Sequence, residues 1–248
     1  MYRVSPIVKQ LLIINIIFFV GSTLSFNSDF IYSLFSLYFP ENPQFKFWQI
    51  ITHMFMHGNI QHIFHQGACS DTMEYNKDFM MDINFEYSKE ILSIAKSNGS
   101  KFIYASSASV YGLNEDSQEI PDNEAPLNFY AESKLLFDQY VMAQDYPAVG
   151  LRYFNVYGRG EENKGKMASM AYKMNQEYVQ SNKISLFKGT NGYKDGEQKR
   201  DFIYIDDVVS INIFFMKNNF HDVYNVGTGK AKTFNEIANI IFNYYHDK

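Results

Sequence analysis

Tyr130 and Lys134 are the two side chains in this sequence whose types and spacing most clearly allow chemistry. Residues four apart lie on the same face of a helix, so the lysine ammonium can approach the tyrosine phenol. A nearby cation favours phenolate and lowers the pKa of a tyrosine from about 10 toward neutral pH. Such a phenol can take a proton from an alcohol while hydride leaves the same carbon. The pair therefore predicts acid/base catalysis; the alternative is an ordinary exposed helix face.

Polar side chains follow the predicted strands on both sides of this pair. A serine-rich turn, 106–109, comes directly after an apolar segment at 101–106, and one of its serines can hydrogen-bond the phenol. Asn155 and Arg159 follow the next apolar segment, 149–154. In open parallel sheets, ligands bind beyond the carboxyl ends of the strands. We therefore expect these side chains to lie along one edge of a sheet.

Four of the six histidines and the single cysteine form a second cluster, made of His53, His57, His62, His65 and Cys69. His53 and His57 are four residues apart and could share a helix face, with His62 or Cys69 as a third zinc ligand. No HExxH motif is present. We predict no metal site here, and interpret the cluster as the junction between two unlike segments.

The composition limits the class of protein. A length of 248 residues suggests one large or two small domains. The chain is 46% hydrophobic, with 23 Phe and 19 Tyr, which is ample for a packed core. A net charge of −5 without long basic runs argues against nucleic acid as a partner. A single cysteine excludes an intrachain disulfide and fits a reducing compartment such as the cytoplasm.

The segment 11–28 contains no charged residue, and Arg3 and Lys9 precede it. About 20 apolar residues are needed to cross a bilayer, so the segment is nearly long enough. The basic flank would place the N-terminus in the cytoplasm. We therefore expect a transmembrane helix that tethers the chain to a membrane; a signal peptide and a buried core helix are the alternatives.

Beyond residue 66, short apolar segments alternate with segments of helical periodicity. The predicted strands are 101–106, 149–154, 202–205 and 223–226, and the predicted helices are 82–96, 130–142, 167–179 and 234–245. Asn98-Gly99 ends the first of these helices. Alternating strands and helices predict an α/β protein with a mainly parallel, doubly wound, Rossmann-like sheet.

Several motifs in this part resemble those of the extended short-chain dehydrogenase/reductase family of nucleotide-sugar epimerases and dehydratases. They are YASSASVYG (104–112), YAESK (130–134), LRYFNVYGRG (151–160), RDFIYIDDV (200–208) and YNVGTGKAKTF (224–234). Three further segments are similar to the members that act on ADP-activated heptose: HQGACSDT (65–72), FMMDIN (79–84) and NKGKMASMAYKMN (163–175). The resemblance extends from about residue 64 to the end of the chain.

The resemblance implies a role for each matching residue. Tyr130 would be a catalytic acid/base, Lys134 its tuning lysine and a ribose contact, and Ser107 its hydroxyl partner. Lys164 would be a second acid/base; its alternative is a solvated loop lysine. The implied cofactor-binding residues are Gln66, Gly67, Ala68, Cys69, Ser70, Asn84, Lys134, Val156 and Lys164. The implied substrate-binding residues are Asn155, Lys166, Lys173, Phe187, Lys188, Gly189, Thr190 and Arg200.

The implied reaction is redox-neutral. Hydride would pass from C6 of the heptose to NADP, with NAD as the alternative cofactor, and return to the opposite face of the transient ketone. The substrate would be ADP-activated heptose or another nucleotide sugar, and the family suggests a homo-oligomer.

The beginning of the chain departs from this family, because the glycine turn GxxGxxG is absent before residue 66. Instead, the segment FKFWQIITHMFMHGNIQHIF (45–64) resembles the start of a rhomboid intramembrane protease, without its GxSG motif or later histidine. We therefore predict a rhomboid-like part, 1–64, joined to an epimerase domain, 65–248, truncated at both ends. Weak or absent catalysis is expected, and a membrane-anchored rhomboid-like protein without protease activity is the alternative.

Overall fold

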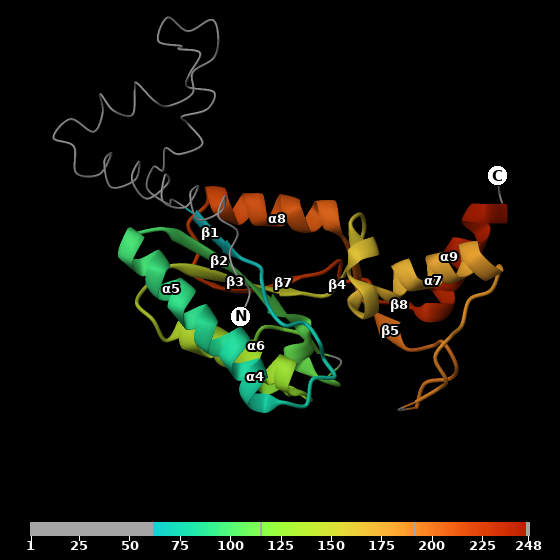
Figure 1. The fold of residues 1–248 in the computed structure, drawn as a ribbon, viewed down its shortest axis with the longest axis horizontal. Coiled ribbons are helices and arrows are strands. Elements are labelled where there is room, and N and C mark those ends of the chain that lie inside the picture. Colours follow the sequence, from blue (N-terminus) through green and yellow to red (C-terminus); the bar gives the residue numbers. More distant parts are fainter. Residues whose placement is uncertain (1–61, 115, 191, 247–248) are drawn as a thin grey trace, which may run out of the picture. The chain divides into compact units, whose positions relative to one another are not determined.

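A parallel sheet lies at the centre of the computed structural model, which describes residues 62–114, 116–190 and 192–246 (Figure 1). Its strands are β1 (His62–His65), β2 (Lys101–Ser107), β3 (Ala148–Tyr153) and β7 (Asp222–Val226), in the order β1-β2-β3-β7. All three neighbouring pairs are parallel. The predicted parallel α/β architecture is confirmed.

Helices cover both faces of this sheet, and the side chains of β2 show why. Phe102 and Tyr104 pack with Phe137 on the face covered by α5 (Tyr87–Asn98) and α6 (Phe129–Met142). Ile103 points the other way and packs in the cluster that includes residues of α8 (Ile205–Lys217). Strands buried on both faces have continuous apolar sequences rather than alternating ones. The sheet is therefore doubly wound, as predicted.

The helices begin and end at residues that satisfy their free backbone groups. Asn128 caps α6 by accepting a hydrogen bond from the backbone N–H of Ala131 at 2.8 Å. Gly99 ends α5 with a φ of 63°, a left-handed conformation that glycine adopts without strain. The helix predicted at 82–96 is longer: α4 (Lys77–Met81) leads through a π-helix, Asp82–Glu86, into α5.

A smaller group of elements lies beside the carboxyl end of the sheet. It contains α7 (Met170–Ser181), α9 (Phe234–His246), the parallel pair β4 (Asn155–Tyr157) and β6 (Phe202–Tyr204), and the antiparallel pair β5 (Lys199–Arg200) and β8 (Lys232–Thr233). Four 3-10 turns are also described. Those at Ala108–Tyr111 and Pro121–Asn123 lie between β2 and α6, and those at Glu161–Asn163 and Gly165–Met167 lie between β4 and α7. Met174 and Tyr178 of α7 pack against Phe234 and Ile241 of α9.

The sequence pattern predicts a strand over 202–205 and no element over 206–217, where the structure has the helix α8. The strand at 202–205 does form over 202–204, but the chain turns helical at Ile205. Asp206 and Asp207 in the first turn favour this change, since carboxylates stabilise a helix N-terminus.

The predictions for the N-terminal part concern residues outside the described ranges. They are the membrane helix at 11–28, His53 and His57, and the rhomboid-like segment up to residue 61; its last residues, 62–64, belong to β1 of the parallel sheet. Among the helices that the structure does describe, none combines the length and the apolar character needed to span a bilayer.

Candidate active site

Ser107, Tyr130 and Lys134 come together where β2 ends and α6 begins. The phenol of Tyr130 is hydrogen-bonded to Ser107, and the Nζ atom of Lys134 lies 5.9 Å from the centre of the Tyr130 ring. Nζ also donates a hydrogen bond to the carbonyl oxygen of Ala105, at 2.7 Å. Lys134 is buried, with 5% of its surface exposed. The three residues predicted as one catalytic group therefore form one cluster.

The pKa of the Tyr130 phenol in this cluster is not lowered as the sequence predicts. Burial raises the pKa of the Tyr130 phenol, and the hydrogen bond with Ser107 opposes this only in part. The expected lowering by Lys134 is not found; the Lys134 ammonium donates to the Ala105 oxygen and lies 5.9 Å from the centre of the Tyr130 ring. Burial also lowers the pKa of Lys134 to about 8, although Asp138 favours the charged form.

The lowered pKa of Lys134 predicts a dependence of stability on pH. The folded-state pKa, about 8, lies below the ordinary 10.5, so the fold favours the neutral amine. Relative to Lys134→Met, the wild type should therefore gain stability as pH rises from 8 toward 10.5 and show a constant difference below pH 7. Urea unfolding of both proteins at pH 7, 8, 9 and 10 measures this. A difference that does not change between pH 7 and 10 would contradict the prediction.

The loop 66–70 follows β1 and is tied to the helix that contains Tyr130. The buried side chain of Asn84 accepts a hydrogen bond from the backbone N–H of Cys69 at 2.8 Å and donates one to its carbonyl oxygen at 2.9 Å. Asn84 also contacts the Ser133 hydroxyl at 3.2 Å, which donates to the Tyr130 carbonyl at 2.7 Å. Asn84 lies within the π-helix, a feature frequent at functional sites.

His65 belongs to the core beside this loop. Its Nε2 atom is hydrogen-bonded to the Ser88 hydroxyl at 2.7 Å, and its ring stacks near Phe102. Burial, with the positive charge of Lys134, lowers the pKa of His65 to about 4, so the ring is neutral at pH 7. In the described ranges, no group of His, Cys, Asp and Glu side chains is arranged to hold a metal ion.

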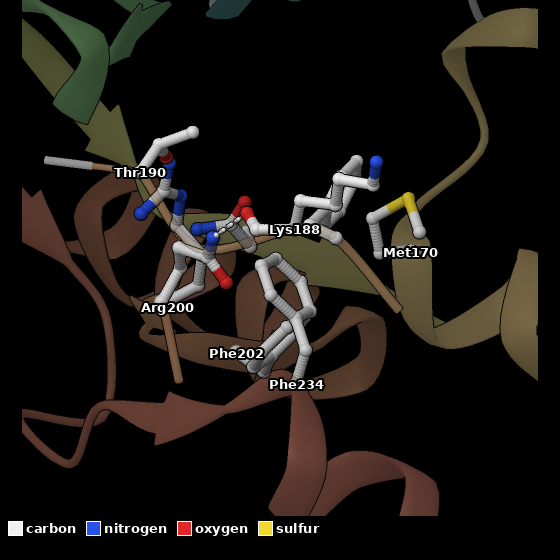
Figure 2. Close-up of a pocket in the computed structure, with 9 residues that line it drawn as sticks. Met170, Lys188, Thr190, Arg200, Phe202 and Phe234 are labelled. Atoms are coloured by element: carbon white, nitrogen blue, oxygen red, sulfur yellow. Dashed lines mark hydrogen bonds between the residues drawn. The ribbon is translucent and has the colours of Figure 1, made fainter. Parts of the chain in front are cut away.

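A pocket of about 490 Å³ lies between β4, β6, α7 and the loop before β5 (Figure 2). Five residues predicted to bind substrate line it: Asn155, Phe187, Lys188, Thr190 and Arg200. Four lining residues were not predicted: Met170, Gln198, Phe202 and Phe234. Figure 2 shows Phe202 and Phe234 forming the apolar wall, with the Arg200 and Lys188 side chains on other sides of the opening. The pocket thus combines an aromatic wall with two cations.

Gly189 fixes the loop on one side of this pocket. Its backbone N–H donates to the Asp195 carboxylate at 2.6 Å. A Cβ atom on Gly189 would lie 2.3 Å from the Tyr193 carbonyl oxygen, so only glycine allows this approach. The predicted substrate loop 187–190 is therefore held as a turn by its own sequence.

The loop that contains Lys164 is held by a buried carboxylate. Glu161 accepts hydrogen bonds from the backbone N–H of Gly158 at 2.9 Å and from the Ser169 hydroxyl at 2.9 Å. Lys164 and Lys166 are exposed on this loop. Lys173, at the start of α7, donates to the Lys166 carbonyl oxygen at 2.5 Å. Among the described contacts none joins Lys164 to Tyr130, so the acid/base role of Lys164 stays a prediction.

Two other predicted cofactor residues, Gln66 and Val156, follow shortly after the ends of the strands β1 and β3. Gln66, directly after β1, accepts a hydrogen bond from the Tyr153 hydroxyl at 3.0 Å. Val156 lies in β4 opposite Ile203 of β6 and packs against the core cluster that contains Ile103 and residues of α8. Both positions fit the predicted edge, and their contacts with a cofactor stay predictions.

This fold and catalytic cluster define the class of the protein. The model of the NAD dependent epimerase/dehydratase family matches residues 49–227, and the chain belongs to this family. A curated relative, the ADP-L-glycero-D-manno-heptose-6-epimerase of Thiobacillus denitrificans, is 42% identical over 198 residues, covering 78% of this chain and 60% of the relative.

Solved structures of epimerases are also similar to this chain. The ADP-L-glycero-D-manno-heptose-6-epimerase of Helicobacter pylori has a TM-score of 0.69 and 41% identity, over 74% of this chain and 58% of that one. The UDP-N-acetylglucosamine 4-epimerase of Methanobrevibacter ruminantium has a TM-score of 0.66 and 26% identity, over 76% of this chain and 61% of that one. The chain thus spans about three fifths of the length of these relatives.

The family match also bears on the N-terminal interpretation. It begins at residue 49 and so extends into the segment assigned above to a rhomboid-like part. The rhomboid resemblance and the chimeric origin gain no support from these matches. The division of the chain near residue 64 stays a prediction.

Proposed function

We propose that the chain is a nucleotide-sugar epimerase that inverts C6 of ADP-activated heptose, with NADP as cofactor and NAD as the alternative. The observation that supports this most directly is the cluster of Ser107, Tyr130 and Lys134 on the same chain as a cation-flanked aromatic pocket. The relatives at 42% and 41% identity are both named for this reaction.

The described residues fit the nicotinamide-ribose half of a dinucleotide. The buried ammonium of Lys134 has three N–H donors, and the Ala105 oxygen takes one of them, so others can meet ribose hydroxyls. The loop 67–70, held by Asn84, offers backbone groups beside the same helix. When bound, NAD(P) accepts a hydride from a carbinol carbon and returns it.

Tyr130 would move the proton that accompanies this hydride. Its phenol is buried and hydrogen-bonded to Ser107, which would orient it toward a substrate hydroxyl. Because burial raises the pKa of Tyr130, the phenol is protonated at pH 7 before the substrate binds. Once this proton is lost, the phenolate, which the hydrogen bond with Ser107 favours, would take the proton of the C6 hydroxyl as hydride leaves, and the phenol so formed would return it to the ketone oxygen as hydride comes back.

The pocket would hold the nucleotide diphosphate. Arg200 and Lys188 supply two cations, and the planar fork of an arginine binds two phosphate oxygens at once. Asn155 lines the same pocket from β4, so the diphosphate can lead from there toward the catalytic cluster. This path connects nucleotide binding with the sugar chemistry.

The direct test follows the epimers of ADP-heptose. The full chain is incubated with one C6 epimer and either NADP or NAD, and the two epimers are resolved by NMR. We expect slow conversion toward a mixture of both epimers without net change in cofactor absorbance, because the chain lacks the glycine turn GxxGxxG before residue 66. A chain that binds cofactor and ADP-heptose but forms only one epimer would refute the proposal. Turnover of a UDP-sugar alone would favour the second candidate, a UDP-sugar epimerase, which the 26% identical relative supports.

Lys164→Met separates the two roles considered for this exposed lysine. A solvated loop lysine should tolerate the change within about twofold in turnover. If Lys164 is a second acid/base group, the turnover of the variant should fall by about 10²-fold or more, and we expect this larger loss. Epimerisation rates of Lys164→Met and of the matched exposed control Lys183→Met provide the measurement. Equal rates for the two variants would leave Tyr130 as the sole proposed acid/base.

A further inference from the structure

Gln198 has an unusual hydrogen-bonding state for a residue in the pocket wall. Its amide nitrogen donates to the Lys188 carbonyl oxygen at 2.7 Å. Its amide oxygen, Oε1, is buried and has no partner among the described residues. A buried polar atom without a partner is costly, and such atoms are rare in folded proteins. A ligand with a hydrogen-bond donor would satisfy this oxygen once the side chains that cover it move aside.

The orientation of the Gln198 amide is set by the backbone. If the amide were turned over, Oε1 would face the Lys188 carbonyl oxygen, and two acceptors would repel each other. The nitrogen therefore stays toward Lys188, and the oxygen is the group left for a ligand. The side chain offers an acceptor at a fixed place.

The surroundings of Gln198 suit a flat aromatic ligand. Phe187 and Phe234 pack with their ring centres 5.1 Å apart, and Phe202 and Phe234 lie 6.3 Å apart, both pairs edge to face. Met170 adds a flexible apolar side chain to the same wall. Such a wall can stack against a nucleobase, whereas Arg200 and Lys188 suit the phosphates attached to it.

We propose that Gln198 selects the base of the nucleotide sugar by accepting a hydrogen bond from the exocyclic amino group of adenine. The inference rests on the proposed function in placing ADP in this pocket. Hypoxanthine has a carbonyl oxygen where adenine has the amino group, so it would place a second acceptor against Oε1. The pocket should therefore bind ADP more tightly than inosine diphosphate.

Calorimetric titration of the full chain with ADP and with inosine diphosphate tests this without turnover. We expect the wild type to prefer ADP by about tenfold or more, the effect of leaving a buried acceptor unpaired. Gln198→Met keeps the length of the side chain and removes its polar atoms, so the preference should fall to within about twofold. Gln180→Met, an exposed position on α7, is the matched control and should keep the wild-type preference.

The outcomes separate the two proposals. Equal binding of both nucleotides by the wild type overturns the inference, and so does an unchanged preference in Gln198→Met. Failure to bind either nucleotide overturns both the inference and the proposed function. An ADP preference that depends on Gln198, in a chain that does not epimerise ADP-heptose, supports the inference and counts against the proposed function. If Gln198→Met does not fold, Gln198→Leu takes its place in the same titrations.

Discussion

Tyr130→Phe is expected to lower the rate of ADP-heptose epimerisation by about 10²–10⁴-fold, the usual contribution of a positioned acid/base group. The phenylalanine keeps the ring that lies over Lys134 and loses only the hydroxyl bonded to Ser107. Cofactor affinity should therefore change little, because the predicted ribose contact, Lys134, remains in place. Single-turnover rates together with fluorescence titration of the cofactor separate the two effects.

The control for this variant is Tyr75→Phe, since Tyr75 is 79% exposed. It should retain the wild-type rate within about twofold. Unaltered turnover in Tyr130→Phe would overturn the mechanism. A parallel loss of cofactor binding would show instead that the hydroxyl has a role in positioning the cofactor.

Much of the sheet and of the catalytic cluster could be predicted from the sequence because the signals are local. Lys101–Ser107 is a buried apolar strand followed by serines, and Asn128 caps the helix that begins just before Tyr130. The spacing of Tyr130 and Lys134 then follows from helix geometry alone. Gly99 likewise ends α5 through its own backbone freedom.

The remaining features depend on contacts between distant segments. Gln198 lines the pocket because the loop after α7 folds back on Lys188, which no local pattern indicates. Phe202 and Phe234 belong to elements that periodicity does predict, but their meeting at the pocket is a tertiary event. The pKa of Tyr130 was misjudged for the same reason: helix spacing predicts a nearby cation, but not the burial that outweighs it.

The buried ion pair between Asp138 and Arg152 supports the strands that lead to the site. Asp138 accepts hydrogen bonds from Arg152 at 2.9 Å, from the Tyr104 hydroxyl at 2.9 Å and from the Ser106 hydroxyl at 2.8 Å. Arg152 also contacts Glu124 at 2.5 Å. One carboxylate on α6 thus joins β2 and β3 close to Ser107, the proposed catalytic residue at the end of β2.

Asp138→Ala is therefore expected to destabilise the fold by about 3–5 kcal/mol, because it leaves two buried hydroxyls without their acceptor and a buried guanidinium with Glu124 as its remaining carboxylate partner. The thermal midpoint should fall by roughly 10 °C or more. The exposed Asp145→Ala should change stability by less than about 0.5 kcal/mol and serves as the control. Thermal unfolding followed by circular dichroism measures both variants.

Combining Asp138→Ala with Arg152→Met tests whether the loss comes from the unpaired charge. The double variant removes the buried guanidinium together with Asp138 and leaves only Glu124 without its partner, so it should be more stable than the sum of the two single losses predicts. If the two losses were strictly additive, Asp138 would act mainly through its hydrogen bonds with Tyr104 and Ser106 in β2, and not through its ion pair with Arg152 in β3. A wild-type midpoint for Asp138→Ala would contradict both explanations, because neither the charge nor the hydroxyls would then need the carboxylate.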